Sequence, residues 1–160
     1  MKRLRSSLGL SLLSTAAAVT PVQPAQPVLT MQRVTTTTVA GKSVERLEVT
    51  QTTRPGDLLQ VSSTLKLTGK EKGARFTVPI PANTTYVSGS ARASTGVKVS
   101  YALDAKGPFS ARPMKKVTVQ EDGKTVTREV AAPQNEYRAV RYDLSGVQGT
   151  VTVAHRIRVN

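Results

Sequence analysis

The sequence contains no cysteine and no tryptophan, and His155 is its only histidine. Without cysteine, the chain cannot form a disulfide, a thiolate zinc site or a lipid-modified N-terminal cysteine. One histidine cannot supply the several nitrogen ligands that a zinc or copper site needs, and no Asp-x-Asp-x-Asp loop for calcium is present. We therefore expect no cofactor and no metal, and a fold held by an ordinary hydrophobic core.

Aromatic and acidic side chains are scarce. Four tyrosines and two phenylalanines offer little for nucleic-acid binding by stacking, so no specific nucleic-acid partner is expected. The chain has 23 basic and 10 acidic side chains, a net charge of +13 at pH 7. Such an excess favours anionic neighbours such as envelope polysaccharide, or it serves only solubility. The carboxylates are scattered, and a hydrolase would need two of them to converge in a cleft.

A long hydrophobic run is also missing. The start, MKRLRSSLGLSLLSTAAAV, has basic residues, an apolar run shorter than the roughly 20 residues of a membrane span, and then small residues. This layout predicts a secretory signal peptide over residues 1–18, with cleavage after Ala25 as an alternative, and no transmembrane span. The protein is therefore expected in the periplasm, the cell envelope or the medium. Removal of Lys2, Arg3 and Arg5 would leave 20 basic against 10 acidic side chains, or +10.

Proline-rich residues 19–30 predict a disordered linker, and residues 31–160 predict one domain. Within that domain apolar and polar residues alternate, as in half-buried strands. In DLLQVSSTLKLTG the leucines and valine at 59, 61, 65 and 67 share one face, and TVTVAHRIRV repeats the pattern with His155 on its apolar face. A lone histidine in that place is typical of a packed rim residue. About eight or nine short strands predict an all-β, antiparallel, immunoglobulin-like sandwich.

Turn residues mark the ends of several strands. Asp122-Gly123 predicts a hairpin within KKVTVQEDGKTVTREV, and Arg54-Pro55-Gly56-Asp57 predicts a turn before the next strand. AGKS at 40–43 lacks the earlier glycine of a phosphate-binding loop.

The last two strands, 137–144 and 150–159, are predicted to pair with each other around the turn at 145–149. A register with Leu144 opposite Val151 would bring their apolar residues to one face. Arg141 would then lie beside Arg156 and Arg158 on the outer face, as a basic strip.

Several segments resemble a known family. RPGDLLQVSSTLKLTG followed by PIPANTTYVSGSA, then YALDAKGPFSARP and YRAVRYDLSGVQGTVTVAHRIRV, are similar to the bacterial cell-surface conserved repeat domain, also called domain of unknown function eleven. The resemblance covers about residues 52–159, with Tyr142 where the family commonly has tryptophan. It implies an immunoglobulin-like sandwich in secreted or envelope proteins, generally without assigned catalysis.

Together these features predict an exported, non-enzymatic envelope protein that acts as a structural or binding module. The expected partner is an acidic surface-layer protein or an anionic glycan, bound by Arg138, Arg141, Arg156, Arg158, Lys115, Lys116, Lys124 and Arg128. One alternative is an accessory subunit that packs by apolar or strand-edge contacts. A carboxylate-dependent hydrolase is a further alternative. The sequence leaves the oligomeric state open.

Overall fold

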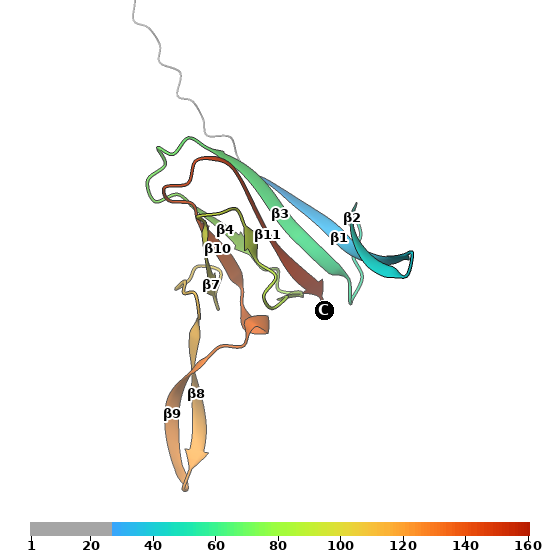
Figure 1. Ribbon diagram of the computed structural model, residues 1–160. Coiled ribbons are helices and arrows are strands. Elements are labelled where there is room, and N and C mark those ends of the chain that lie inside the picture. Colours follow the sequence, from blue (N-terminus) through green and yellow to red (C-terminus); the bar gives the residue numbers. More distant parts are fainter. Residues whose placement is uncertain (1–26) are drawn as a thin grey trace, which may run out of the picture.

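The computed structural model describes residues 27–160, so the predicted signal peptide and residues 19–26 of the predicted linker lie outside the described residues. Within this range the chain forms antiparallel β-sheets and one 3-10 turn, η1 (Gln134–Glu136), with no α-helix. The predicted all-β antiparallel sandwich is confirmed (Figure 1). The described residues form eleven strands where eight or nine were expected, because two edge strands of two and three residues are too short to show alternation.

The strands form two facing sheets and a separate hairpin. The large sheet has the order β2-β1-β3-β11-β5, with β6 also beside β11. Its strands are β1 (Val28–Val39), β2 (Lys42–Val49), β3 (Leu58–Leu67), β5 (Thr84–Tyr86), β6 (Arg92–Ala93) and β11 (Gly149–Val159). The small sheet has the order β4-β10-β7, and the separate hairpin pairs β8 with β9. These strands are β4 (Arg75–Pro79), β7 (Lys98–Ala102), β8 (Met114–Glu121), β9 (Lys124–Ala131) and β10 (Ala139–Asp143).

The hydrophobic core lies between the two sheets and follows the alternation of the sequence. Along β11, residues 151, 153, 155, 157 and 159 are buried, whereas 150, 152 and 158 are exposed and 154 and 156 are half-buried. Leu59 and Val61 of β3 join them, and Val140 and Tyr142 of β10 meet them from the small sheet. Burial of each aliphatic side chain contributes about 1.5–3 kcal/mol.

The last two strands do not pair with each other. β10 lies between β4 and β7, and β11 lies between β3 and β5, so the predicted register of Leu144 opposite Val151 is wrong. The turn after β10 carries the chain from the small sheet to the large one. Two strands with one apolar face each can bury those faces side by side or face to face, and here they meet face to face across the core.

Strand β1 begins at Val28, three residues before the predicted domain boundary at 31. Residues 28–33 of β1 pair with β3, and the Ser63 hydroxyl donates to the Val28 carbonyl oxygen at 2.9 Å. The three residues at 28–30 therefore belong to the sheet and not to a linker. They show no alternation in the sequence, because Val28 and Leu29 are both apolar and residues 28–31 are all exposed.

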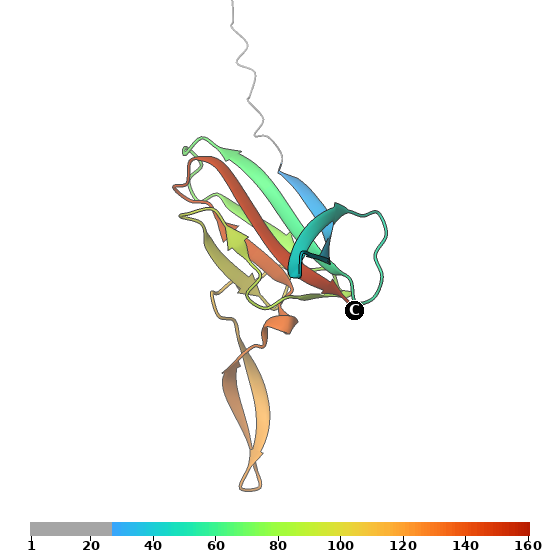
Figure 2. The same ribbon diagram turned by 45° about the vertical axis from the view of Figure 1, so that its right-hand side comes forward.

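Two hairpins project from the sandwich in different directions (Figures 1 and 2). One is β8–β9, which confirms the hairpin predicted at Asp122-Gly123, both of which have positive φ. The other is the outer part of β1–β2, where residues 34–39 continue past the end of their pairing with β3. Neither projecting part is covered by the opposite sheet.

Shortening of the β8–β9 hairpin tests whether it is needed for folding. Replacement of residues 116–129 by Asn-Gly should change the free energy of unfolding by less than about 1 kcal/mol, because none of them belongs to the core cluster. The bond from the Ala132 N–H to the Pro113 carbonyl oxygen, 2.9 Å, still closes the base. Urea denaturation measures the effect, and a loss above about 2 kcal/mol would contradict the prediction.

Candidate functional site

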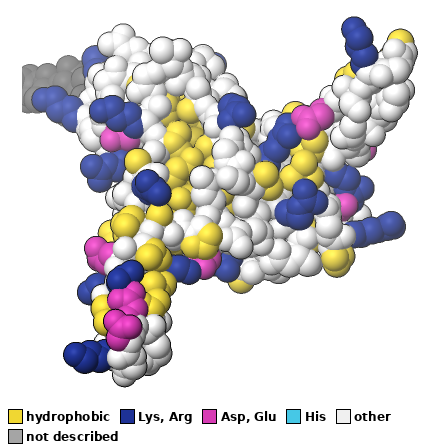
Figure 3. All heavy atoms as spheres, turned by 60° about the horizontal axis from the view of Figure 1, so that its bottom comes forward, with side chains coloured by type: hydrophobic (Ala, Val, Ile, Leu, Met, Phe, Trp, Pro, Cys, Tyr) yellow, Lys and Arg dark blue, Asp and Glu magenta, His cyan; other side chains and the backbone are white. Residues whose placement is uncertain are grey.

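The eight basic residues expected to bind a partner lie on separate surfaces. Arg156 and Arg158 lie on the outer face of the large sheet, because their neighbour Ile157 points into the core. Arg141 lies on the outer face of the small sheet, between the buried Val140 and Tyr142. The predicted basic strip that joins these three arginines is therefore wrong. Figure 3 shows Lys and Arg side chains scattered over the visible face.

Three of the eight cations are already paired with carboxylates of the same chain. Arg156 binds Glu45 through two hydrogen bonds of 3.0 and 2.6 Å, and this arginine holds the pKa of the Glu45 carboxyl below its usual value. On the β8–β9 hairpin and at its base, the ion pairs are Lys115–Glu136 and Arg128–Glu121, each with a closest distance of 2.6 Å. Residues 114–131 carry four basic and three acidic side chains, so this hairpin, with Lys116 and Lys124, is nearly neutral.

The remaining arginines contact neighbouring polar or aromatic groups. Arg138 donates to the Thr84 carbonyl oxygen at 3.3 Å, and Arg158 donates to that of Gly56 at 3.1 Å. The Arg141 guanidinium lies 3.5 Å from the centroid of the Phe109 ring, an arrangement that adds about 0.5–1 kcal/mol at an exposed site. Structural roles therefore account for much of the basic surface.

Exposed hydrophobic side chains are concentrated on the strands of the two hairpins. All nine large hydrophobic residues that are exposed within residues 27–160 belong to β1, β2, β8 or β9: Val28, Leu29, Met31, Val39, Val44, Leu47, Val49, Met114 and Val130. Seven of them are on β1 and β2. This surface was not predicted from the sequence, although the mixed charged and apolar residues on both faces of KSVERLEV indicate a strand that is not buried on either side.

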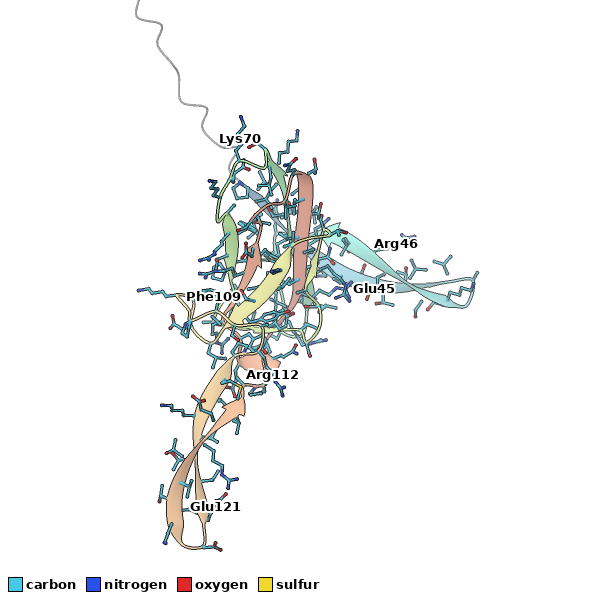
Figure 4. The ribbon with its side chains drawn as sticks, turned by 60° about the vertical axis from the view of Figure 1, so that its left-hand side comes forward. Glu45, Arg46, Lys70, Phe109, Arg112 and Glu121 are labelled. Atoms are coloured by element: carbon cyan, nitrogen blue, oxygen red, sulfur yellow. The ribbon has the colours of Figure 1, made fainter. Side chains whose placement is uncertain are left out.

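Strand β2 forms a free edge of the large sheet. All eight of its residues are exposed, and β1 is its only strand partner among residues 27–160 (Figure 4). Ala40 and Gly41 have φ values of 49° and 77°, which define a two-residue turn, so AGKS is a hairpin turn and Val39 and Lys42 form a hydrogen-bonded pair. This turn sets the hydrogen-bond direction of every residue in β2.

Hydrogen-bonded and non-hydrogen-bonded pairs alternate along an antiparallel ladder. The even-numbered residues of β2 therefore bond to β1, and the odd-numbered residues direct their N–H and C=O groups outward. The same alternation continues across β1 and β3 to β11. There the even-numbered Arg156 directs its carbonyl oxygen away from β3 and accepts the Val87 N–H at 2.9 Å, as expected if the odd-numbered residues of β2 point outward. Within residues 27–160, the outward backbone groups of Ser43, Glu45, Leu47 and Val49 have no hydrogen-bond partner.

A cavity of about 450 Å³ lies at the base of the β8–β9 hairpin. Its lining includes two carboxylates, those of Asp104 and Glu129, together with Arg112. Figure 4 shows Arg112 at the base of the hairpin. The Asp104 carboxylate accepts the Lys106 N–H at 2.8 Å and thereby stabilises its own turn. This cavity is where the hydrolase alternative would have to place its two acids.

His155 lies in the core and not at its rim, with 1% of its surface exposed. Its Nδ1 is 3.1 Å from the Tyr142 hydroxyl, which donates to the Ala154 carbonyl oxygen at 3.0 Å. We assign the histidine proton to Nδ1, because the Tyr142 hydroxyl directs its own proton at Ala154. The buried Nε2 has no partner among the described residues. Burial lowers the pKa of His155 to about 4.

Comparison of the chain with family models, with curated proteins and with solved structures found no match. The resemblance to the cell-surface repeat domain therefore stays a prediction from short motifs. In the part of the chain that the structure describes, no helix is long and apolar enough to cross a membrane. Nor do three His, Asp or Glu side chains in that part gather into a group that could hold a metal ion.

Proposed function

We propose that the chain is an exported, non-enzymatic binding module of the bacterial cell envelope that attaches to its partner through the free edge of β2. The observation that carries the proposal is the combination of outward backbone groups with exposed Val44, Leu47 and Val49 on one strand. Backbone hydrogen bonds supply affinity when a strand is added to a sheet, and alternate side chains supply specificity.

The β2 edge is less protected than the sheet edges of most soluble proteins, because charged side chains are the one protective device on this strand. Such proteins commonly protect an edge with proline, a bulge, a very short strand or a covering loop. Strand β2 is eight residues long, contains no proline and pairs with β1 without interruption from 42 to 49. Charged residues at 42, 45, 46 and 48 keep the edge soluble, so that it selects a complementary strand.

Export is supported by the signal-like layout of residues 1–18 and by the resemblance to envelope domains. A chain without cysteine needs no disulfide formation after export, and the core between the two sheets holds the fold by itself. A rigid sandwich with two projecting hairpins suits a binding module, because one surface can attach to a partner while another stays accessible.

Substitution of Leu47 by proline tests the proposal. It removes the central outward N–H of β2 without a change in charge, and we expect recovery of the tagged protein with native envelope fractions to fall about tenfold. Thr127→Pro is the matched control, because Thr127 is the corresponding outward residue on β9. Equal recovery of the wild type and Leu47→Pro would overturn the proposal. Circular dichroism checks that both variants fold.

A second candidate function is electrostatic attachment to an acidic surface-layer protein or an anionic glycan. It is favoured by the excess of 20 basic over 10 acidic side chains after residue 26. Recovery at low and at high salt separates the two candidates. Retention through the β2 edge persists at about 1 M salt, whereas attachment by charge is lost because the Debye length falls to about 3 Å.

A further inference from the structure

We propose that the strand added to the β2 edge is β2 of a second copy of this chain, paired antiparallel with Leu47 opposite the second copy's Leu47. This inference rests on the proposed function, because it names the partner of the same edge. The result would be one continuous sheet that runs through two sandwiches. Two properties of β2 favour a second copy in this register: the charges of its side chains, and the outward direction of the backbone groups of its odd-numbered residues.

The geometry of a symmetric pair restricts the choice of register. Two antiparallel edges related by a twofold axis place residues that are directly opposite each other on the same face of the sheet. Opposed residue numbers must therefore add to an even number, and one residue lies on the axis opposite its own copy. The candidates for this central position are the residues of β2 from 44 to 49, because Lys42 on the axis would face an identical charge and Ser43 on the axis would leave residues 45–49 beyond the paired region.

Repulsion between like charges excludes most residues of β2 from the position on the twofold axis. Glu45, Arg46 or Glu48 on the axis would each face an identical charge, which is destabilising in directly opposed pairs. Val44 on the axis would place Arg46 opposite the second copy's Lys42, which again opposes like charges. Val49 on the axis leaves most of β2 beyond the paired region.

Leu47 on the axis satisfies every requirement. Arg46 then faces the second copy's Glu48, and Glu48 faces the second copy's Arg46, as non-hydrogen-bonded pairs in which side chains approach closest. Leu47 exchanges both backbone hydrogen bonds with its counterpart, because its N–H and C=O point outward. Glu45 and Val49 form the flanking hydrogen-bonded pairs. The 43%-exposed Leu47 gains an apolar neighbour in its own counterpart, which also lies diagonal to the 80%-exposed Val49.

Arg46 and Glu48 of each copy can both form ion pairs with the second copy. No carboxylate lies within ion-pairing distance of Arg46 among residues 27–160. Glu48 accepts a hydrogen bond of 3.1 Å from the Thr35 hydroxyl, which leaves its other oxygen open. Glu45 and Arg46 point to opposite sides of β2 (Figure 4), so the Glu45–Arg156 pair does not compete with the pairing of Arg46.

A charge-swap experiment tests the register. We expect the purified wild type to sediment as a dimer, and Arg46→Glu or Glu48→Arg alone to weaken the dimer about 30-fold, because each places two like-charged pairs at the interface. An equimolar mixture of the two variants should regain the dimer, because every opposed pair in the mixed dimer again has opposite charges. Recovery on mixing also excludes misfolding as the cause of the loss. Sedimentation velocity over a concentration series measures all three.

Lys116→Glu and Glu129→Lys are the matched controls. These residues face each other on the β8–β9 hairpin, and neither change should alter dimerisation. A wild type that stays monomeric at about 100 μM, or a mixture that stays monomeric, overturns self-pairing. If envelope retention is still lost in Leu47→Pro, the edge attaches a different protein and the proposed function stands. If retention is unaffected, the proposed function fails as well.

Discussion

Truncation of Tyr142 to alanine is expected to lower the free energy of unfolding by about 4 kcal/mol. Tyr142 is a fully buried residue of β10, and its ring stacks on Phe76 with centroids 6.4 Å apart. Removal of a buried aromatic ring costs about 3–5 kcal/mol, because the transfer energy is lost and a cavity remains. Urea denaturation of the variant beside the wild type measures the difference.

The hydroxyl and the ring of Tyr142 can be separated by a second variant. Tyr142→Phe keeps the ring but leaves the Ala154 carbonyl oxygen and His155 Nδ1 without their buried partner, so we expect a loss of about 1–2 kcal/mol. Val39→Ala, at a 50%-exposed position, is the control and should change stability by less than about 0.5 kcal/mol. A loss below about 1 kcal/mol in Tyr142→Ala would show that this residue does not organise the core.

A fall in pH from 7 to 5 is expected to reduce the free energy of unfolding by about 2 kcal/mol through His155 alone. In the folded protein burial holds the pKa of His155 at about 4, against 6.5 for the ordinary side chain. Between pH 6.5 and pH 4 the unfolded chain binds a proton at His155, whereas the folded chain does not. Stability is therefore full above pH 6.5, declines as pH falls toward 4, and by then has lost about 3 kcal/mol.

The location of Nε2 explains why His155 is not protonated in the folded protein at these pH values. Nδ1 already carries a hydrogen directed at Tyr142, so protonation must occur at Nε2, which is buried and has no acceptor within residues 27–160. A charged imidazole there would be neither solvated nor paired. The aromatic neighbours are Tyr86 and Tyr142, and burial raises the pKa of Tyr142 further above its ordinary value, so it is neutral in this range.

The variant His155→Gln should have a flat stability profile between pH 7 and 5, because glutamine does not ionise. This window lies above the range in which Glu71 titrates. The pKa of Glu71 is lowered to about 2 by hydrogen bonds from Thr68, so its contribution is present above pH 4.5 and is lost only as pH falls toward 2. Chemical denaturation at each pH gives both profiles. Equal pH dependence in the wild type and the variant would contradict the assignment to His155.

Local patterns in the sequence were sufficient to predict much of the fold. The alternation around Leu59 and Val61 placed β3 with one face in the core, and the same parity placed His155 on the buried face of β11. The turn at Asp122-Gly123 was predictable because few residues accept a positive φ. Each of these features depends on residues within one strand or one turn.

The candidate site could not be predicted in the same way. Arg141 and Arg156 were expected on one face, and they lie on opposite faces of the sandwich. Glu45 neutralises Arg156 from 111 residues away in the sequence, so no local pattern indicates that pair. The edge of β2 was missed for a related reason, because a free edge is defined by the absence of a neighbouring strand.

By itself, the sequence determined which residues can form strands, where turns occur and which side of each strand is apolar. These properties follow from the stereochemistry of single residues and the two-residue period of a strand. Only the tertiary structure decided that β10 and β11 meet across the core, that three cations are paired within the chain and that β2 is left without an outer neighbour. The physical reason is that strand pairing is set by the total burial of all apolar faces at once, and several pairings satisfy the pattern of any one strand equally well.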